Sequence, residues 1–314
     1  MYQGDNRMIF ATLGEVLDRA RAGKYAVGAF NINDMEIAKA VGGAAKEEKS
    51  AVILAVSPSA IKYAGIAYIY EIARVTADQS GVPTVLHLDH GTTFGDCIGC
   101  IRHGWSSVMY DGSKLPLEEN IRQTAKIVEV AHAAGVSVEA ELGKLAGVEG
   151  HVSVEEKDAI FTNPDEAKAF VERTGVDALA VAIGTSHGAY KFKGEANLDF
   201  PRLEKIERLV NIPIVLHGAS GVPKDVLDKA AKYGARLPGA SGVPDDAIKK
   251  AISLGVAKIN IDTDIRLAMT AALRQVLAEH PEEFDPRKIM GPAEDAMKAV
   301  AKSKMRLFGS SGRA

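Results

Sequence analysis

The chain is poor in cysteine and in aromatic residues, and it has no long apolar run. Its 314 residues include 2 cysteines and 1 tryptophan, and aromatic residues make up 6% of the sequence. Two cysteines cannot form a disulfide framework, so we expect a protein of the reducing cytoplasm. No stretch approaches the ~18 uncharged apolar residues of a membrane helix, and the N-terminus lacks the basic-then-apolar order of a signal peptide. The sequence therefore predicts no association with a membrane.

An excess of charge of one sign is also missing. The formal net charge is −3, and the Lys and Arg residues are interspersed with Asp and Glu. Because no basic face is indicated, we expect no nucleic-acid partner. Hydrophobic residues make up 46% of the chain and charged residues 25%, which is typical of a globular enzyme.

Short apolar runs alternate with amphipathic segments along almost the whole chain. The apolar runs predict buried parallel strands at Tyr25–Phe30, Ala51–Val56, Thr84–Leu88, Ser107–Tyr110, Ser137–Glu141, Ala178–Ile183, Ile212–Leu216 and Ala257–Ile261. The amphipathic segments predict helices at Met35–Glu48, Tyr68–Gln79, Leu117–Ala134, Pro164–Thr174, Phe200–Leu209 and Pro244–Leu254. This alternation favours an α/β fold, a (β/α)8 TIM barrel, which we expect to span residues 1–314 as a single domain. A doubly wound open sheet needs a glycine-rich phosphate loop after its first strand, and Asn31–Asp34 is not one.

A tandem duplication extends the connection after the seventh predicted strand. Gly218–Ala235 (GASGVPKDVLDKAAKYGA) recurs as Gly239–Val256 (GASGVPDDAIKKAISLGV). A solenoid needs about three or more copies, so we interpret the pair as extra length inside one barrel connection, at a surface or subunit contact. From about Arg266 to Lys304 the sequence predicts C-terminal helices. Breaks between them are expected at Pro281, Pro286 and Pro292.

Three histidines, His90, His187 and His217, each follow a predicted strand. In a parallel barrel the C-terminal ends of all strands meet at one face, which carries the active site. Three imidazoles at that face, with Asp89 beside one of them, are typical of a catalytic zinc site with an open coordination position. The sequence therefore favours a zinc-dependent lyase or hydrolase over a binding module.

Polar residues end the other predicted strands as well: Asn31, Ser57, Asp111, Glu141, and Asn260 with Asp262. Asp111 and Glu141 have a simpler alternative, a bond to loop backbone. Three segments after the last strands resemble phosphate cradles, in which glycine N–H groups and hydroxyls approach an anion: Ser186–Gly188, Gly218–Ser220 and Asn260–Thr263. The glycine-rich segment Leu142–His151 predicts a mobile lid, and Glu149 within it is a candidate catalytic acid or a solvated loop charge.

Seven motifs together resemble one family: GAFN (Gly28–Asn31), HLDHG (His87–Gly91), SVMYDG (Ser107–Gly112), VEAELG (Val138–Gly143), AIGTSHG (Ala182–Gly188), LHGASG (Leu216–Gly221) and KINIDTD (Lys258–Asp264). The chain resembles class II, metal-dependent fructose-1,6-bisphosphate aldolase, in the subgroup that also contains the tagatose-bisphosphate aldolases. The resemblance implies a lyase of glycolysis and gluconeogenesis. It would reversibly cleave fructose 1,6-bisphosphate to dihydroxyacetone phosphate and glyceraldehyde 3-phosphate, as a homodimer or homotetramer.

The resemblance also implies a role for each candidate residue. His90, His187 and His217 match the ligands of a catalytic Zn²⁺, and Asp111 with Glu141 match a second divalent-ion position. Asp89 matches the acid/base at the C4 hydroxyl, and Glu149 matches the loop acid at C3. The residues that match substrate contacts are Asn31, Ser57, Gly188, Gly218, Ala219, Ser220, Asn260, Ile261, Asp262, Thr263 and Arg266. A monovalent cation, Na⁺ or K⁺, often sits among the carbonyls of these loops.

Three alternatives stay open at this point. A zinc hydrolase on the same barrel usually shows a His-x-His pair after strand one, where this chain has Asn31-Ile32-Asn33. A non-catalytic sugar-phosphate-binding barrel needs the cradles but neither Asp89 nor three metal ligands. A tagatose-bisphosphate aldolase usually has a small apolar residue where Asp262 stands, and it lacks the arginine at Arg266. We expect Asp262 to bond hydroxyls on the C4 side and Arg266 to reach the C6 phosphate, in its own or a neighbouring subunit.

Overall fold

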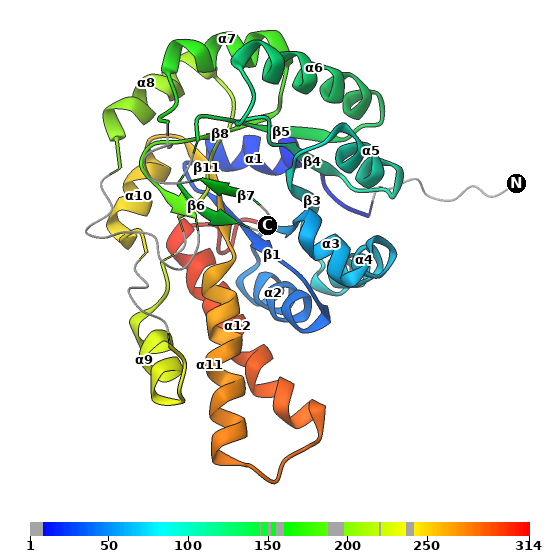
Figure 1. Cartoon of the computed structure of the whole chain (residues 1–314), viewed down its shortest axis with the longest axis vertical. Helices are drawn as coiled ribbons and strands as arrows, with labels where there is room; N and C mark the ends of the chain where they lie inside the picture. Colours follow the sequence, from blue (N-terminus) through cyan, green and yellow to red (C-terminus); the bar gives the residue numbers. More distant parts are fainter. Residues whose placement is uncertain are drawn as a thin grey trace, which may run out of the picture.

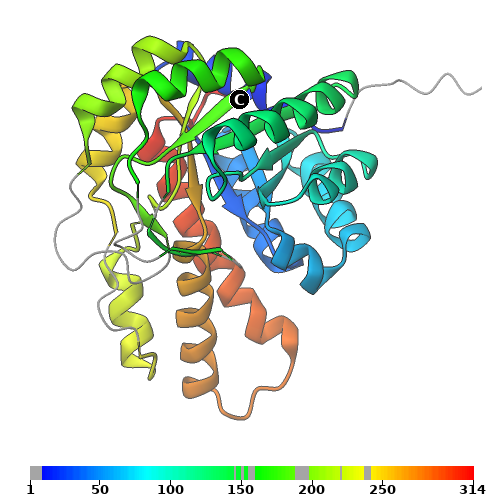
Figure 2. The same cartoon turned by 45° about the horizontal axis from the view of Figure 1, so that its top comes forward.

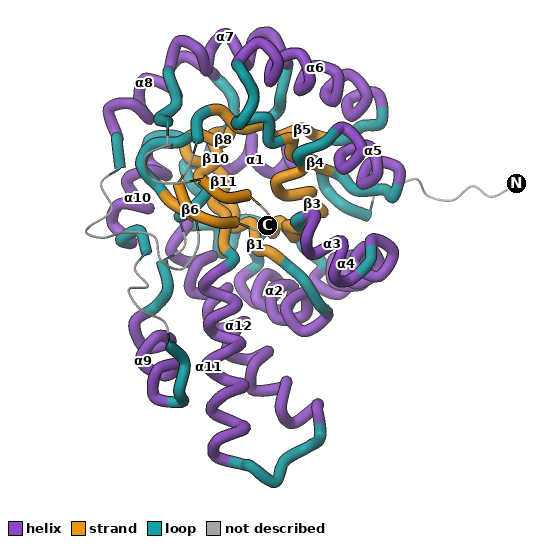
Figure 3. Tube along the Cα trace, viewed as in Figure 1, coloured by secondary structure: helices purple, strands orange, loops and turns teal. Residues whose placement is uncertain are grey.

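The computed structural model describes residues 9–144, 146–149, 152–154, 160–187, 198–219, 221–236 and 242–314, with no account of the side chains of 146–149, 152–154 and 186–187. Eight parallel strands close into a barrel in the order β1-β11-β10-β8-β5-β4-β3-β2. Their bounds are β1 Val27–Asn31, β2 Val52–Val56, β3 Thr84–Gly91, β4 Ser107–Tyr110, β5 Ser137–Leu142, β8 Ala178–Val181, β10 Ile214–Leu216 and β11 Val256–Ile261. The predicted TIM barrel is confirmed, with strands at its centre and helices around them (Figures 1 and 3).

The outer helices follow the strands in sequence. They are α2 Met35–Glu48, α3 Pro58–Ala64, α4 Ile66–Ser80, α5 Phe94–Arg102, α6 Leu117–Ala133, α7 Pro164–Thr174, α8 Phe200–Val210 and α10 Asp245–Ser253. Local signals set their ends: the Asp34 side chain accepts from the Ile37 N–H at the start of α2, and Lys49 ends that helix with a left-handed φ of 49°. Strand residues that face outward, such as Leu54, pack beneath these helices and are fully buried.

The N-terminal end of the barrel is closed by α1 (Leu13–Ala22). Thr12 and Glu15 form a capping box at its start, and Leu13 and Leu17 are fully buried against the small inward-facing residues of the strands. The backbone N–H of Gly14 donates to Ser137 Oγ at the first residue of β5, over 3.1 Å. Because this end is plugged, ligands enter the barrel from the opposite, C-terminal end.

A second, small sheet lies beyond the C-terminal ends of the strands. It has the order β7-β6-β9: β6 (Ala146–Glu149) pairs antiparallel with β7 (Val152–Val154) and parallel with β9 (Ser186–His187). The segment expected to be a glycine-rich lid, Leu142–His151, therefore contains β6, the first strand of a hairpin whose second strand is β7. Through the pairing of β6 with β9, this hairpin contacts the segment after β8, where His187 lies.

The duplicated connection after β10 contains two helices with different positions. The helix of the second copy, α10, occupies the ordinary barrel position before β11, whereas the helix of the first copy, α9 (Lys224–Lys232), packs against α11 (Thr263–Glu279). α11 forms an antiparallel hairpin with α12 (Pro286–Phe308) that extends away from the barrel (Figure 2). The extra length expected at a surface is thus α9.

One predicted break in this C-terminal region is wrong. Pro281 and Pro286 delimit the turn between α11 and α12, but Pro292 lies inside α12. A proline costs a helix one backbone hydrogen bond and about 3 kcal/mol. α12 continues past it because later residues, among them Met297 and Met305, are fully buried, and the helix packs along α2. Among the described helices, none is both long and apolar enough to cross a membrane.

Candidate metal and catalytic site

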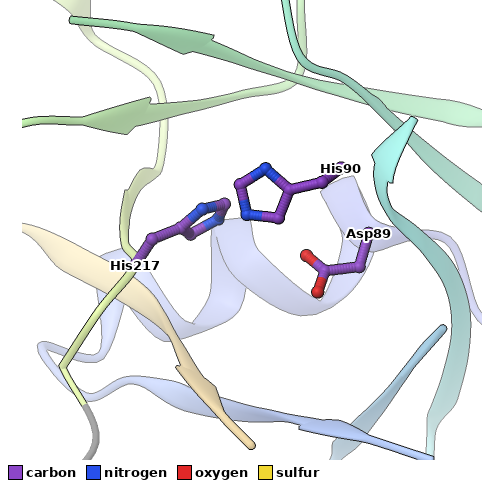
Figure 4. Close-up of side chains that lie close together, drawn as sticks. All are labelled: Asp89, His90 and His217. Atoms are coloured by element: carbon purple, nitrogen blue, oxygen red, sulfur yellow. The ribbon is translucent and has the colours of Figure 1, made fainter. Parts of the chain in front are cut away.

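Three of the predicted site residues meet at the C-terminal end of the barrel. Asp89 and His90 come from β3 and His217 follows β10; the ligand atoms of these three side chains lie within 4.8 Å of one another (Figure 4). The ring centroids of His90 and His217 are 4.7 Å apart, with the rings inclined at 69°. All three residues are buried. The third predicted histidine, His187, ends β9, and its side chain lies outside the described residues.

The backbone of β3 bends so that two consecutive residues serve one site. In a regular strand Asp89 and His90 would point to opposite faces. The register of β3 with β4 shifts between Leu88 and Gly91, and His90 has a left-handed φ of 52°. Such bulges redirect side chains next to active sites, and a positive φ outside glycine is a strained conformation that clusters at functional positions. The bulge therefore brings the His90 imidazole to the side of the strand where Asp89 lies.

Asp111 and Glu141 form a second cluster with His90, again with ligand atoms within 4.8 Å. His90 Nδ1 donates to Asp111 Oδ2 over 3.0 Å, and Glu141 Oε2 lies 3.6 Å from Nδ1 of both His90 and His217. Asp111 also accepts from the N–H and hydroxyl of Ser113, as the backbone alternative expects, and its metal assignment stays a prediction. Burial alone would raise the pKa of Asp111, but the bonds from His90 and Ser113 hold it well below its usual range.

The carboxylate of Asp89 is held by two amides. Asn31 Nδ2 donates to Oδ2 over 2.8 Å, and Asn260 Nδ2 donates to Oδ1 over 3.0 Å. Asn31 is the last residue of β1, and Asn260 is the penultimate residue of the neighbouring strand β11. They were expected as substrate contacts, and the structure shows them as donors that orient Asp89. An oriented, fully buried carboxylate next to two imidazoles suits a general base.

The other expected substrate contacts that belong to the described residues lie around this end of the barrel. Ser57 caps α3 and is nearly buried, and Gly218 follows His217 with a φ of 62°. Gly188 and Ser220 lie outside the described residues, as does the side chain of Glu149. Asp262 precedes α11, and its Oδ1 lies 2.7 Å from Nε of Arg266, which is half-exposed. Of the remaining contacts, Ala219 and Ile261 are buried and Thr263 begins α11.

The sequence did not single out the buried charges beneath the histidines. Glu139 Oε1 accepts from His217 Nε2 over 2.9 Å, and Lys258 Nζ lies 2.9 and 3.1 Å from the two oxygens of Glu139. His87 Nε2 lies 3.6 Å from the same carboxylate, and all four side chains are fully buried. The alternation of side chains along a strand could have identified two of them. His87 and Glu139 each stand two residues before a predicted site residue, and residues two apart in a strand point to the same face of the sheet.

Charge and burial have opposite effects on the pKa of Glu139 but act together on the pKa of His87. Burial would raise the pKa of Glu139, but the Lys258 ammonium and the bond from His217 hold it well below its usual range. Burial, aided by the charge of Lys258, lowers the pKa of His87 to about 3. Burial also lowers the pKa of His217. At neutral pH both imidazoles are therefore uncharged, the form in which a histidine binds a metal.

The donor set fits a divalent cation. Two described imidazoles and three carboxylates converge, and each imidazole already donates one ring N–H to a carboxylate, which is the usual arrangement for a metal-bound histidine. Mixed imidazole and carboxylate ligands suit zinc at the histidines, and oxygen-rich ligands suit harder cations at Asp111 and Glu141.

Proteins with similar sequences and structures are aldolases. The family described as fructose-bisphosphate aldolase class-II matches residues 11–236 and 237–313. The chain is 55% identical over 300 residues to a fructose-bisphosphate aldolase of Thermus caldophilus, covering 96% of this chain and 98% of that protein. It is 49% identical to one of Giardia intestinalis, over 98% of this chain and 95% of that one. Among solved structures, the YdjI aldolase of Escherichia coli K12 has a TM-score of 0.77 and 32% identity, over 97% of this chain and 99% of that chain.

Proposed function

The chain belongs to the class II fructose-bisphosphate aldolase family, and on that premise we propose how its residues carry out the reversible cleavage of fructose 1,6-bisphosphate to dihydroxyacetone phosphate and glyceraldehyde 3-phosphate. The family resemblance seen in the motifs is confirmed, which sets aside the hydrolase and the non-catalytic barrel. The assignment of roles rests on the meeting of Asp89, His90 and His217 at one end of the barrel. We propose a cytoplasmic, glycolytic enzyme, in line with its low cysteine content.

The residues that would hold a metal ion are assigned from their donor atoms. Class II aldolases are zinc-dependent, and we assign His90, His187 and His217 as ligands, since three imidazoles leave one coordination position open. Asp111 and Glu141 are assigned to a second divalent ion, and the loop carbonyls near the substrate phosphate to a monovalent cation. Zinc, when bound, supplies Lewis-acid stabilisation of the charge that develops on the ketose half.

Asp89 is assigned to the proton transfer at C4. Cleavage of the C3–C4 bond requires the C4 hydroxyl to lose its proton, so that C4 becomes the aldehyde carbon. Asp89 accepts this proton and returns it in the condensation direction, with its orientation fixed by Asn31 and Asn260. The electron pair of the broken bond stays on C3, and we assign Glu149 as the acid that protonates this carbon to give dihydroxyacetone phosphate.

The substrate is held at its two phosphates and at the hydroxyls between them. We assign the ketose-phosphate half to Gly188, Gly218–Ser220 and Asn260–Thr263, with further contacts from Asn31 and Ser57. Asp262 is assigned to the C4-side hydroxyls and Arg266 to the C6 phosphate, in its own or a neighbouring subunit of a homodimer or homotetramer. Their 2.7 Å ion pair keeps both groups at the same edge of the site.

Metal removal tests the mechanism directly. Chelation should abolish cleavage of fructose 1,6-bisphosphate and added zinc should restore it, whereas borohydride with substrate should leave activity intact. Lys258 is the barrel-strand lysine that a Schiff-base mechanism would need, but its ammonium is already paired with Glu139. Trapping of substrate on Lys258 by borohydride, or full activity after metal removal, would overturn the metal mechanism.

A further inference from the structure

A buried contact links His217 to Glu139, a residue to which the proposed function assigns no role. Glu139 lies on β5 below Glu141, and its Oε1 accepts from His217 Nε2 over 2.9 Å, with both side chains fully buried. We propose that Glu139 is a positioning residue, which fixes the His217 ring with Nε2 toward the barrel interior and Nδ1 toward the metal site, and that Lys258 holds Glu139 in place. The inference rests on the proposed role of His217 as a zinc ligand.

The two nitrogens of the His217 ring face different carboxylates. Nε2 is bonded to Glu139, whereas Nδ1 lies 3.6 Å from Glu141 Oε2 in the cluster with His90. A ring turned over by rotation would place a C–H group against Glu139 Oε1 and lose the bond. Because the partner of one ring nitrogen decides which nitrogen is left for a metal, the bond to Glu139 selects Nδ1.

The backbone does little to fix this ring. The strand pairings of β10 end at Val215 with β8 and at Leu216 with β11, so His217 lies just past the hydrogen-bonded ladder. Gly218 follows with a left-handed φ of 62°, at the start of a loop. Since the pairings with both neighbouring strands end before His217, the strand register alone does not orient the imidazole, and Glu139 supplies a side-chain bond that does.

Lys258 completes the arrangement from the opposite side of the barrel. β5 and β11 are separated in the sheet by β8 and β10, so the Lys258 side chain reaches Glu139 through the barrel interior. Its ammonium lies near both carboxylate oxygens, at 2.9 and 3.1 Å, which fixes the plane of the carboxylate. The strand residues beside Lys258, Val27 and Val215, are apolar. A buried carboxylate without a counter-ion would be strongly destabilising, so Lys258 makes Glu139 tolerable at this depth.

A matched pair of double variants isolates the hydrogen bond from the charges. Glu139→Gln with Lys258→Met removes both charges but keeps an oxygen that accepts from His217 Nε2. Glu139→Met with Lys258→Met is nearly isosteric and removes the acceptor too. The zinc dissociation constant, measured by competition with a chromogenic chelator at one pH, should stay within about 10-fold of wild type in the first variant. In the second it should rise by a further 10- to 100-fold, as is typical when the partner of a metal-binding histidine is lost.

Controls separate this role from general loosening and from the zinc assignment. Asp177→Asn alters another histidine–carboxylate contact, to His132 at 3.0 Å, and keeps an oxygen that can accept from the Val138 N–H on β5, so it should leave the zinc constant unchanged. Urea unfolding of each metal-free protein establishes that it is folded; Glu139→Leu replaces Glu139→Met if the latter does not fold. Equal zinc constants for the two double variants would overturn the positioning role while leaving the zinc site intact. Wild-type affinity in His217→Ala would overturn the zinc assignment itself, and this inference with it.

Discussion

Replacing Asp89 with asparagine should separate proton transfer from folding and metal binding. The side chain is fully buried, and its oxygens accept from the amides of Asn31 and Asn260. Asparagine has the same shape, but one carboxylate oxygen becomes an NH₂ group, which faces one of these donors. Among the described residues, Oδ1 of Asn31 and Oδ1 of Asn260 have no hydrogen-bond partner. Rotation of either amide therefore offers the new NH₂ group an acceptor.

The two expected costs differ greatly in size. One rearranged hydrogen bond changes the free energy of unfolding by about 1 kcal/mol. Loss of the general base should lower kcat by about 10²- to 10⁴-fold, because an amide cannot take the C4 hydroxyl proton. At about 1.4 kcal/mol per tenfold change in rate, this corresponds to roughly 3–5 kcal/mol of activation free energy.

Three measurements on Asp89→Asn test the reasoning: kcat for fructose 1,6-bisphosphate cleavage in a coupled assay, the zinc dissociation constant, and urea unfolding. We expect a loss in kcat with zinc affinity and stability near those of wild type. A variant that keeps more than half of the wild-type kcat removes Asp89 from the mechanism. A parallel loss of zinc would instead make Asp89 a part of the metal site.

The remaining predictions concern stability, stereochemistry and proton exchange. The pKa of His87 is near 6.5 in the unfolded chain but about 3 in the folded protein, so the unfolded state binds more protons between these two pH values. The free energy of unfolding therefore falls as pH drops from 6.5 toward 3, by up to about 1.4 kcal/mol per pH unit. Urea titrations of metal-free protein at pH values between 6.5 and 5 should show that the free energy of unfolding falls less steeply with decreasing pH in His87→Gln than in wild type. An equal pH dependence in the two proteins would refute the buried neutral imidazole. Asp262→Ala should lower the ratio of kcat/KM for fructose over tagatose 1,6-bisphosphate; an unchanged ratio, or a wild type that prefers tagatose, contradicts the assignment of Asp262. Glu149→Ala should slow proton exchange at the dihydroxyacetone phosphate carbon, and unchanged exchange would make Glu149 a solvated loop charge.

The barrel was predictable because its strands are buried on both faces. Such strands read as continuous apolar runs, and helix caps and glycines mark the segments between them. The errors fall where a local rule competes with tertiary structure. The predicted strand ends at Leu88, but β3 runs on to Gly91 through a bulge that includes the polar Asp89 and His90. Pro292 reads as a helix break, but burial of α12 against α2 outweighs it.

The site was predictable to the extent that strand ends coincide. Any parallel barrel brings its C-terminal strand ends to one face, so Asp89, His90 and His217 could be placed together without knowledge of the register. The pairing of Glu139 with Lys258 could not, because the two strands are not neighbours in the sheet. Which side chains meet across a barrel depends on its closure and stagger, and no local pattern in the sequence carries that information.

Substitutions in the two halves of the barrel interior should affect stability in different ways. Near α1 the inward residues are apolar, such as Ile53 and Val85, and each change there acts mainly through its own packing. Near the site, Lys258, Glu139 and His217 form one connected set, so that removing a single charge leaves its partner buried and unpaired. The effects of these substitutions on the free energy of unfolding should therefore be non-additive. Glu139→Gln alone leaves the Lys258 ammonium buried without its counter-ion, whereas Glu139→Gln with Lys258→Met removes both buried charges. The double variant is then expected to unfold at a higher urea concentration than the single one, even though it departs further from the native sequence.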